Sequence, residues 1–256
     1  MILYSWNVNG LRAIARKPEF QEFLSRPEID LLGLQETRAT PEQLTPELSA
    51  PPGYQAAFAC HKTKKGYSGV GVYSRLKPLK THLELPDPQW DQEGRLVHLE
   101  LDKFHFLAVY FPNGQSSEER LGYKLGYYEA FLAYCQRLRK SKPVVACGDF
   151  NTAHQSIDLA EPEANANNSG FLPEERAFLD RLIAAGYLDA FRVLNGELPG
   201  QYSWWSYRSG DRRRNLGWRI DYFFVSEELR PNLARAWLEP ETTGSDHCPV
   251  GLELRF

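Results

Sequence analysis

Carboxylates, amides and a histidine recur in this sequence where apolar runs end. The residues with the most evident chemical potential are Glu36, Asp149, Asn151, Asp221 and His247. The ends of neighbouring strands often gather at one edge of a sheet, and ligands bind in the cleft that forms there. We therefore expect these side chains to converge at one sheet edge.

Phosphodiester hydrolysis is the chemistry that this set suits. The reaction needs an activated water, charge neutralisation on the phosphate oxygens and help for the leaving oxygen. Mg²⁺ prefers oxygen ligands and keeps several waters, so Glu36 can anchor it. Asp149 can take a proton from water, and Asn151 can hold a developing oxyanion. His247, kept protonated by Asp221, can donate to a non-bridging oxygen.

Each motif also has a purely structural interpretation. Asp and Asn favour turns, and segment 148–151 taken alone is more typical of a turn than of a site. Glu36 alone could be a helix-capping or surface acid, and the pair 246–247 alone could lie on the surface. Asp221 is harder to explain in this way, because its neighbours are apolar and a buried carboxylate is costly unless it is paired. His247 is the partner that we expect for it.

The elements that must position these residues are mostly strands. Apolar runs and alternation predict strands over 2–8, 29–35, 69–74, 95–101, 104–110, 144–148, 219–225 and 250–254. Strands outnumber helices and are separated by hairpin-length turns as well as crossovers. This pattern favours two packed sheets with flanking helices over one doubly wound sheet.

Three helices are predicted between these strands. One is short, over 18–25, and another opens at 171–175 with Leu179 and Leu182 on its buried side. The strongest signal covers 117–140, where one apolar face would contain Leu121, Leu125, Tyr128, Leu132 and Cys135.

Composition narrows the class of protein. The 256 residues are 42% hydrophobic and 25% charged, as in a globular domain, and no linker or repeat divides them. No apolar stretch approaches the ~20 residues of a membrane span, and no export signal is recognisable, so we expect a cytoplasmic protein without membrane contact. The four cysteines suit a reducing compartment. The net charge of −3 means that any nucleic-acid contact must come from a local basic face.

Other hydrolytic chemistries lack their signatures. The sequence has no His/Cys set spaced for zinc, no Gly-x-Ser-x-Gly elbow and no Gly-x-x-x-x-Gly-Lys-Ser/Thr phosphate loop.

A series of motifs runs in order along the whole chain. They are Trp6-Asn7-Val8-Asn9-Gly10-Leu11-Arg12, Leu34-Gln35-Glu36-Thr37, Gly66-Tyr67-Ser68-Gly69, Tyr110-Phe111-Pro112-Asn113, Gly148-Asp149-Phe150-Asn151, Gly170-Phe171-Leu172-Pro173-Glu174-Glu175-Arg176, Gly217-Trp218-Arg219-Ile220-Asp221-Tyr222 and Gly244-Ser245-Asp246-His247-Cys248-Pro249. In this the sequence resembles the exonuclease III family of abasic-site endonucleases, within the endonuclease/exonuclease/phosphatase superfamily. The resemblance implies an α/β fold: one catalytic domain over 1–256, a four-layered sandwich of two mixed β-sheets flanked by helices.

The resemblance also implies a metal site. Glu36 would be the main Mg²⁺ ligand, with Mn²⁺ as a substitute ion, and Asn7 and Asp246 would lie beside it. Asp149 and Asn151 would serve a second ion. In the family the position of Asp246 is commonly placed near that second ion, with Asn9 nearby, and the amide of Asn9 should weaken the site. The sequence leaves open whether one or two metals act.

Catalytic roles follow from the same resemblance. Asp149 would activate the attacking water, while Asn151 and Tyr110 would hold the phosphate and its developing charge. Asp221 and His247 would form a carboxylate–imidazole pair.

The catalytic set does not name the substrate, so the segment 202–218 matters. Its aromatic residues are Tyr202, Trp204, Trp205, Tyr207 and Trp218, and its basic residues are Arg208, Arg212, Arg213 and Arg214. Basic residues serve phosphates and aromatic residues serve sugars or bases, although Tyr202 and Trp205 could equally be core. In the family, residues matching Trp204, Trp218 and Ile220 form a small apolar pocket for an extruded, baseless deoxyribose, which would crowd a nucleotide that keeps its base.

Four further features bear on the DNA partner. Asn113 would contact the neighbouring phosphate, and Lys124 would contact a nucleotide. Glycine at Gly170 leaves room for continuous duplex, which favours internal incision. The basic loop 61–67 could grip the backbone or could be a solvated surface loop.

We therefore expect a monomeric DNA-repair enzyme that cuts duplex DNA 5′ to abasic sites and leaves a 3′-hydroxyl, with 3′→5′ exonuclease or 3′-end repair activity; its partner would be double-stranded DNA with abasic or damaged sites. We expect it in the cytoplasm, associated with the nucleoid when it acts on DNA. One alternative is a phosphodiesterase or phosphatase of the same superfamily acting on a small-molecule or lipid phosphoester. The other is a DNA-binding protein without catalysis, whose signature would be a broken catalytic set. The sequence does not decide whether uracil or other damaged bases are also incised.

Overall fold

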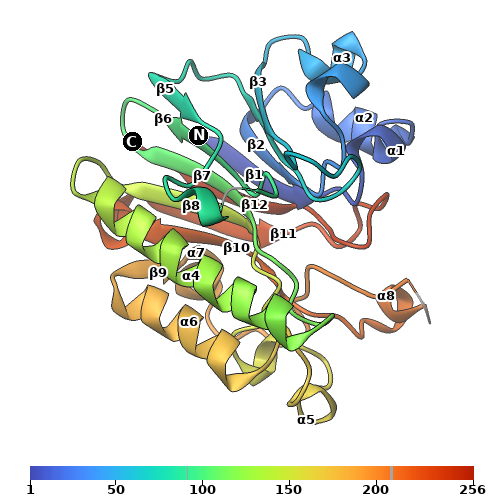
Figure 1. The fold of residues 1–256 in the computed structure, drawn as a ribbon, viewed down its shortest axis with the longest axis vertical. Helices are drawn as coiled ribbons and strands as arrows, with labels where there is room; N and C mark the ends of the chain where they lie inside the picture. Colours follow the sequence, from blue (N-terminus) through green and yellow to red (C-terminus); the bar gives the residue numbers. More distant parts are fainter. Residues whose placement is uncertain (91, 208–209) are drawn as a thin grey trace.

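Two six-stranded mixed sheets lie face to face at the centre of the protein (Figure 1). The computed structural model describes residues 1–90, 92–207 and 210–256. The first sheet has the order β11-β12-β1-β2-β4-β3 and the second β5-β6-β7-β8-β10-β9. The first contains β1 (Ile2–Asn7), β2 (Ile29–Gln35), β3 (Gln55–Ala59), β4 (Val70–Ser74), β11 (Leu233–Leu238) and β12 (Val250–Leu254). The second contains β5 (Lys80–His82), β6 (Leu96–Glu100), β7 (His105–Tyr110), β8 (Val144–Asp149), β9 (Tyr187–Asp189) and β10 (Asp221–Ser226).

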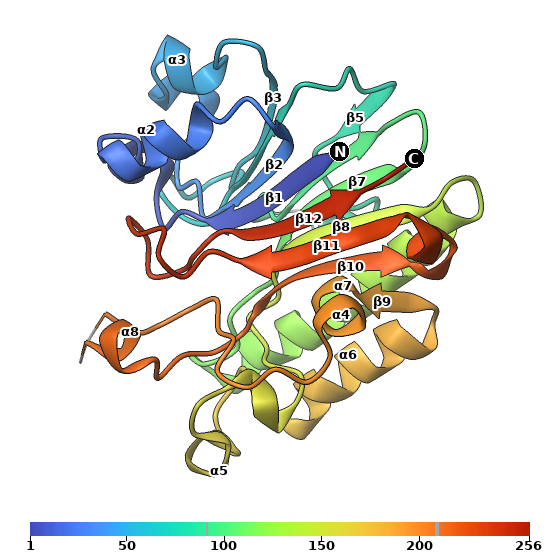
Figure 2. The ribbon, with the colours of Figure 1, turned by 180° about the vertical axis from the view of Figure 1, so that it is seen from behind.

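Helices cover the outer face of each sheet (Figures 1 and 2). The helices are α1 (Leu11–Ile14), α2 (Pro18–Leu24), α3 (Pro46–Ser49), α4 (Glu118–Arg139), α5 (Pro162–Asn165), α6 (Pro173–Ala184), α7 (Ala190–Asn195) and α8 (Asp211–Arg214). Short 3₁₀ turns span Pro41–Gln43, Pro88–Trp90, Ser156–Asp158 and Glu227–Asn232. With α1 and α2 outside the first sheet and α4 and α6 outside the second, the predicted four-layered α/β sandwich is confirmed.

Three apolar clusters hold the layers together. Between the sheets, residues such as Leu31, Phe106 and Val145 are fully buried. A second cluster, rich in aromatic rings, joins the second sheet to α4 and α6 and includes the stacked pair Tyr128 and Phe178, whose ring centroids are 3.9 Å apart. The third joins the first sheet to α1 and α2. This burial fixes the two sheets against each other.

The predicted strands are all present, but four strands were not predicted. β5 is exposed along its whole length, and β9 has three residues. β3 and β11 are only partly buried, because they form the two edges of the first sheet. The segment predicted over 219–225 enters the sheet only at Asp221.

The buried face of α4 differs from the prediction. The helix itself is confirmed, with the Ser117 hydroxyl accepting from the Arg120 amide at its start. Its buried residues are Lys124, Tyr127, Tyr128, Phe131, Tyr134 and Cys135. Leu121, Leu125 and Leu132, predicted on that face, are only partly buried. The aromatic rings fill the space above the second sheet, so the face of the helix that contains them points to the sheet. Lys124 is buried on the same face.

In α6 the predicted buried residues Leu179 and Leu182 are indeed buried. No helix in the described ranges is long and apolar enough to cross a membrane.

Candidate active site

A cleft of about 550 Å³ opens at the edge where β1, β2, β7, β8 and β10 bring their polar ends together. Its lining includes the predicted residues Asn9, Glu36, Tyr110, Asn113, Asp149, Asn151, Gly170, Trp204, Trp218, Ile220, Asp246 and His247. Residues from 9 to 247 thus meet in one site, and the predicted convergence is confirmed.

Strand register explains how the acids meet. Within the second sheet Asp149 pairs with Tyr110 on one side and with Asp221 on the other. In the first sheet Asn7 pairs with Gln35, the residue before Glu36. The packing of the sheets then brings these two strand ends together.

Asn7 links the two sheets at this point. It is fully buried, and its Nδ2 donates to Glu36 Oε1 at 3.1 Å and to Asp149 Oδ2 at 2.9 Å. Its Oδ1 accepts from the Asn9 amide at 3.0 Å. Asn7 therefore presents nitrogen to the acids, and in this arrangement it orients Glu36 instead of offering an oxygen ligand beside it.

Glu36 lines the cleft, and its two carboxylate oxygens have different partners. Oε1 also accepts from the Tyr110 hydroxyl at 2.8 Å, and Oε2 forms an ion pair with Arg38. Burial and the charge of Glu36 raise the pKa of Tyr110 well above its usual value, so this hydroxyl keeps its proton and donates.

The backbone at the site adopts left-handed conformations. Asn9, Glu36, Arg38 and Asn151, which all line the cleft, have φ of 46°, 52°, 49° and 50°. Such conformations cost energy in residues other than glycine and cluster at functional sites.

Asp149 is a buried carboxyl with an unusual affinity for protons. Burial raises its pKa to about 7, with the charge of Asp221 adding to this effect and His247 opposing it. Its Oδ1 accepts from the Asn151 amide at 2.8 Å. A carboxyl with a pKa near neutrality suits a general base.

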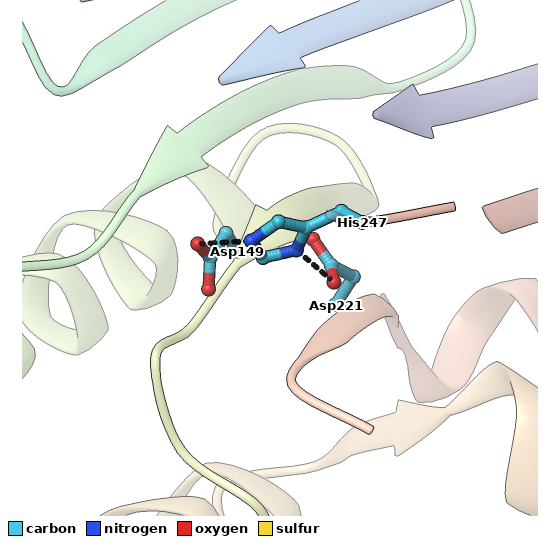
Figure 3. A group of neighbouring side chains, drawn as sticks. All are labelled: Asp149, Asp221 and His247. Atoms are coloured by element: carbon cyan, nitrogen blue, oxygen red, sulfur yellow. Dashed lines mark hydrogen bonds and ion pairs between the residues drawn. The ribbon is translucent and has the colours of Figure 1, made fainter. Parts of the chain in front are cut away.

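His247 lies between two acids, with one ring nitrogen toward each (Figure 3). Nδ1 is 2.8 Å from Asp221 Oδ2, and Nε2 is 3.8 Å from Asp149 Oδ2. Burial alone lowers the pKa of His247, but the charge and hydrogen bond of Asp221, with Asp149 and Asp246, overcome it and raise the pKa to about 10. The side chain is therefore an imidazolium at neutral pH, and the predicted Asp221–His247 pair forms.

Ser203 orients Asp221. This role was not predicted from the sequence. The Ser203 hydroxyl oxygen accepts from the amides of Ile220 and Asp221, each at 3.1 Å, and so its proton is free to go to Asp221 Oδ2 at 2.7 Å. No sequence pattern marks this serine, because its partners lie 17 and 18 residues away. Arg38 was missed too, although it follows the Gln35-Glu36-Thr37 motif directly.

Within the described chain, one acidic cluster and the single acid Glu36 are candidate cation sites. Asp149, Asp221 and His247 have candidate ligand atoms within 4.8 Å of one another. A protonated imidazole has no lone pair for a metal, however, so this cluster is better described as an ion-pair network. Glu36 fits a hard cation better: it is an oxygen ligand at the mouth of the cleft, and it already attracts the guanidinium of Arg38.

Asp246 and Asn151 both line the cleft but have different hydrogen-bond partners. Asp246 accepts from Asn9 Nδ2 at 2.9 Å and from the Trp204 indole at 3.1 Å. Asn151 donates from Nδ2 to the Phe111 carbonyl and accepts from Asn113 at 3.2 Å. The structure thus brings Asn9 to Asp246, as predicted, and it also joins Asn113 to Asn151.

Trp204 and Trp218 form a partly exposed apolar wall with the side chain of Ile220. The two tryptophans pair through a β-bridge, and their ring centroids are 6.3 Å apart at 81°. Tyr202 and Trp205, for which core and site were equally expected, are buried in a separate cluster with Cys248.

One predicted DNA contact, that of Lys124, needs correction, whereas the expectation for Gly170 stays a prediction. Lys124 is completely buried, and its Nζ bonds Glu175 Oε1 at 2.5 Å and the Asn151 carbonyl at 2.7 Å, so it cannot reach a nucleotide. Gly170 has φ of 100°, and a Cβ there would lie 3.2 Å from the Trp218 ring. A side chain at this position would press on the tryptophan wall first.

Only some of the basic residues predicted near the cleft are exposed and could contact DNA. Arg212 packs on Trp205 and donates to the carbonyls of Pro240, Thr242 and Ser245, whereas Arg213 is exposed. Arg208 lies outside the described residues. The basic loop 61–67 is mostly exposed, with Lys64 over the Tyr67 ring.

Comparisons with known proteins agree with this geometry. The model of the endonuclease/exonuclease/phosphatase family matches residues 4–247. The chain is 45% identical over 256 residues to the exodeoxyribonuclease of Bacillus subtilis, covering 100% of both chains. It is 38% identical to the DNA repair nuclease APEX1 of Danio rerio, covering 99% of this chain and 82% of that one. Among solved structures, an AP endonuclease from Archaeoglobus fulgidus superposes with a TM-score of 0.89 at 25% identity, covering 100% of both chains.

The raised pKa of His247 gives a direct prediction. With metal removed by EDTA, His247 should remain an imidazolium at pH 8, since the proton is lost only as the pH approaches about 10. Asp221→Asn should lower the pKa of His247, because the largest charge opposing burial is lost and only Asp149 and Asp246 remain. ¹⁵N NMR of the imidazole nitrogens measures both, with the partly buried His61, whose pKa is lowered by burial, as the internal control. A neutral wild-type His247 at pH 8 would contradict this electrostatic account.

Proposed function

Because the chain belongs to the endonuclease/exonuclease/phosphatase family, we propose that it is a metal-dependent DNA-repair phosphodiesterase that incises duplex DNA on the 5′ side of abasic sites and leaves a 3′-hydroxyl. The observation that carries the proposal is one cleft that combines the acids and imidazolium of a phosphate site with a wall made of Trp204, Trp218 and Ile220. The Bacillus subtilis relative is named an exodeoxyribonuclease, so 3′→5′ exonuclease or 3′-end repair activity is part of the proposal.

Each group has a defined task in this mechanism. Glu36 would hold Mg²⁺, or Mn²⁺ in its place, with Asn7 and Asp246 beside it; the ion supplies positive charge against the phosphate oxygens. Asp149 accepts the proton of the attacking water, for which a pKa near 7 is well matched. His247 donates Nε2–H to a non-bridging oxygen, and Asn151 and Tyr110 hold the developing charge.

Asn7 keeps the two acids in their separate roles. Its two N–H groups point at Glu36 and Asp149, and this places a cation anchor and a base on opposite sides of one amide. Asp149 and Asn151 would also face a second ion, but Asn9 places an amide donor on Asp246, which weakens that position.

Substrate selection is assigned to the tryptophan wall. A deoxyribose without a base would fit against Trp204, Trp218 and Ile220, and a nucleotide with its base would be crowded. Asn113 would contact the adjacent phosphate, and its side chain is placed for this by a hydrogen bond to Asn151.

The biological setting is proposed on the same basis. We take residues 1–256 as one catalytic domain, acting as a monomer on double-stranded DNA with abasic or damaged sites. The four cysteines are free, which suits the reducing cytoplasm, where the protein would associate with the nucleoid.

The first test is cleavage of a duplex with one abasic analogue. Wild-type protein should cut it in Mg²⁺ and not in EDTA, and Asp149→Asn should lower kcat by roughly 10²- to 10⁴-fold, since the base is lost while the shape is kept. The products are resolved on a denaturing gel. Equal cleavage in EDTA, or an unchanged rate in Asp149→Asn, would refute the catalytic assignment.

The second test concerns selectivity. Trp218→Ala should lower the preference for the abasic duplex over an intact one by roughly 10-fold, because one wall of the apolar pocket is removed. Rates on both duplexes are compared under single-turnover conditions. Trp90→Ala, in a separate cavity with Leu85 and Gly126, is the matched control. An unchanged preference in Trp218→Ala would place selectivity elsewhere.

A further inference from the structure

The ion pair between Lys124 and Glu175 is completely buried beneath the floor of the cleft. Both side chains are 0% exposed, and Lys124 Nζ lies 2.5 Å from Glu175 Oε1. Lys124 comes from α4 and Glu175 from the first turn of α6. A buried ion pair is a weak source of stability, because removing two charges from water costs about as much as their attraction returns. Its contacts must be examined for another role.

The lysine end of the pair holds the catalytic amide. Nζ donates to the main-chain carbonyl of Asn151 at 2.7 Å. Asn151 is in a left-handed conformation with φ of 50°, and its side chain is set by the Phe111 carbonyl and by Asn113. The ammonium therefore fixes the peptide that follows a strained residue whose side chain faces the phosphate.

The glutamate end holds the loop behind the tryptophan wall. Oε2 accepts from the amides of Gly170 at 2.5 Å and Leu172 at 3.1 Å, and Oε1 also accepts from the Ser169 hydroxyl at 2.8 Å. Four donors, including Lys124, thus converge on one carboxylate. These hydrogen bonds tie the 169–172 loop to one buried carboxylate.

Both ends meet at Gly170. A Cβ on this residue would lie 3.2 Å from the Trp218 ring and 3.3 Å from the Asn151 carbonyl oxygen, the same atom that Lys124 binds. The Gly170 carbonyl in turn accepts from the Ala153 amide at 2.8 Å. The catalytic turn and the pocket wall are therefore packed against each other through one glycine.

We propose that the Lys124–Glu175 pair positions the active site: it locks the Asn151 turn and the Gly170 loop together, so that the phosphate-holding amide and the Trp218 wall keep one spacing. Lys124 and Glu175 are positioning residues, because neither reaches the cleft. The inference deepens the proposed function and rests on it for its kinetic part. Helix capping alone would explain the Leu172 contact of Glu175 but not the burial of Lys124 on Asn151.

The test replaces the ammonium with an apolar chain of similar length. Lys124→Met should lower kcat on the abasic duplex by roughly 10- to 100-fold, the effect of misplacing a catalytic group by about 1 Å. It should also lower the preference for abasic over intact duplex, because the pocket wall moves with the turn. Lys124→Arg, which keeps the charge, should recover most of both.

Lys142 offers a matched control. Its Nζ also binds one glutamate and one main-chain carbonyl, Glu100 Oε1 and Leu101 O, each at 2.9 Å. Lys142 lies next to the start of β8, whereas the catalytic groups follow its end. Lys142→Met should therefore keep the wild-type kcat and preference, whatever stability it loses.

A second readout does not depend on activity. Hydrogen exchange of peptides covering 150–153 and 168–172 should be faster in Lys124→Met than in wild type, and unchanged there in Lys142→Met. If Lys124→Met does not fold, Glu175→Gln provides the same measurement, since its carbonyl can still cap Gly170 and Leu172 while the ion pair is lost.

Each result has one meaning. Faster exchange in both segments with lower kcat supports the proposal. Wild-type exchange and kcat in folded Lys124→Met overturn it, as do equal losses in Lys124→Met and Lys142→Met. If wild-type protein does not cut the abasic duplex, the proposed function fails, and the exchange data alone still decide whether the pair locks the two segments.

Discussion

The site depends on one buried amide that bridges two sheets. Asn7 ends a strand of the first sheet, yet it donates to Glu36 beside it and to Asp149 at the end of a strand in the second. Two carboxylates this close would repel each other without such donors. Because one amide contacts acids from both sheets, the packing of the sheets also sets the distance between the two acids.

A buried network extends this control to the other side of the cleft. Arg219 is 0% exposed and binds Asp158 and Asp189, each at 2.7 Å, which fixes the chain between Trp218 and Asp221. Ser203 then orients Asp221, and Asp221 holds His247 as an imidazolium. Because the pKa of Asp149 is about 7 and His247 is charged, the same cleft provides a proton acceptor and a proton donor at one pH.

Much of this could be predicted from the sequence, since strand ends and residue types follow local rules. The runs before Glu36 and Asp149 marked the sheet edge, and the apolar neighbours of Asp221 required a partner, which is His247. Long-range burial could not be predicted in this way. The face of α4 depends on how aromatic rings fill the space over the second sheet, and Lys124 looked like a surface cation because Glu175, 51 residues away, is not visible in local sequence.

The bridging role of Asn7 is tested most directly by a double-mutant cycle with Asp149. Single-turnover cleavage of the abasic duplex is measured for Asn7→Ala, Asp149→Asn and the double variant. If Asn7 acts by positioning Asp149, Asn7→Ala should slow cleavage by roughly 10²-fold, and the combined loss in the double variant should be clearly smaller than the product of the two single losses, with the contact to Glu36 accounting for the remainder. Independent, fully additive losses, or a wild-type rate in Asn7→Ala, would contradict the account.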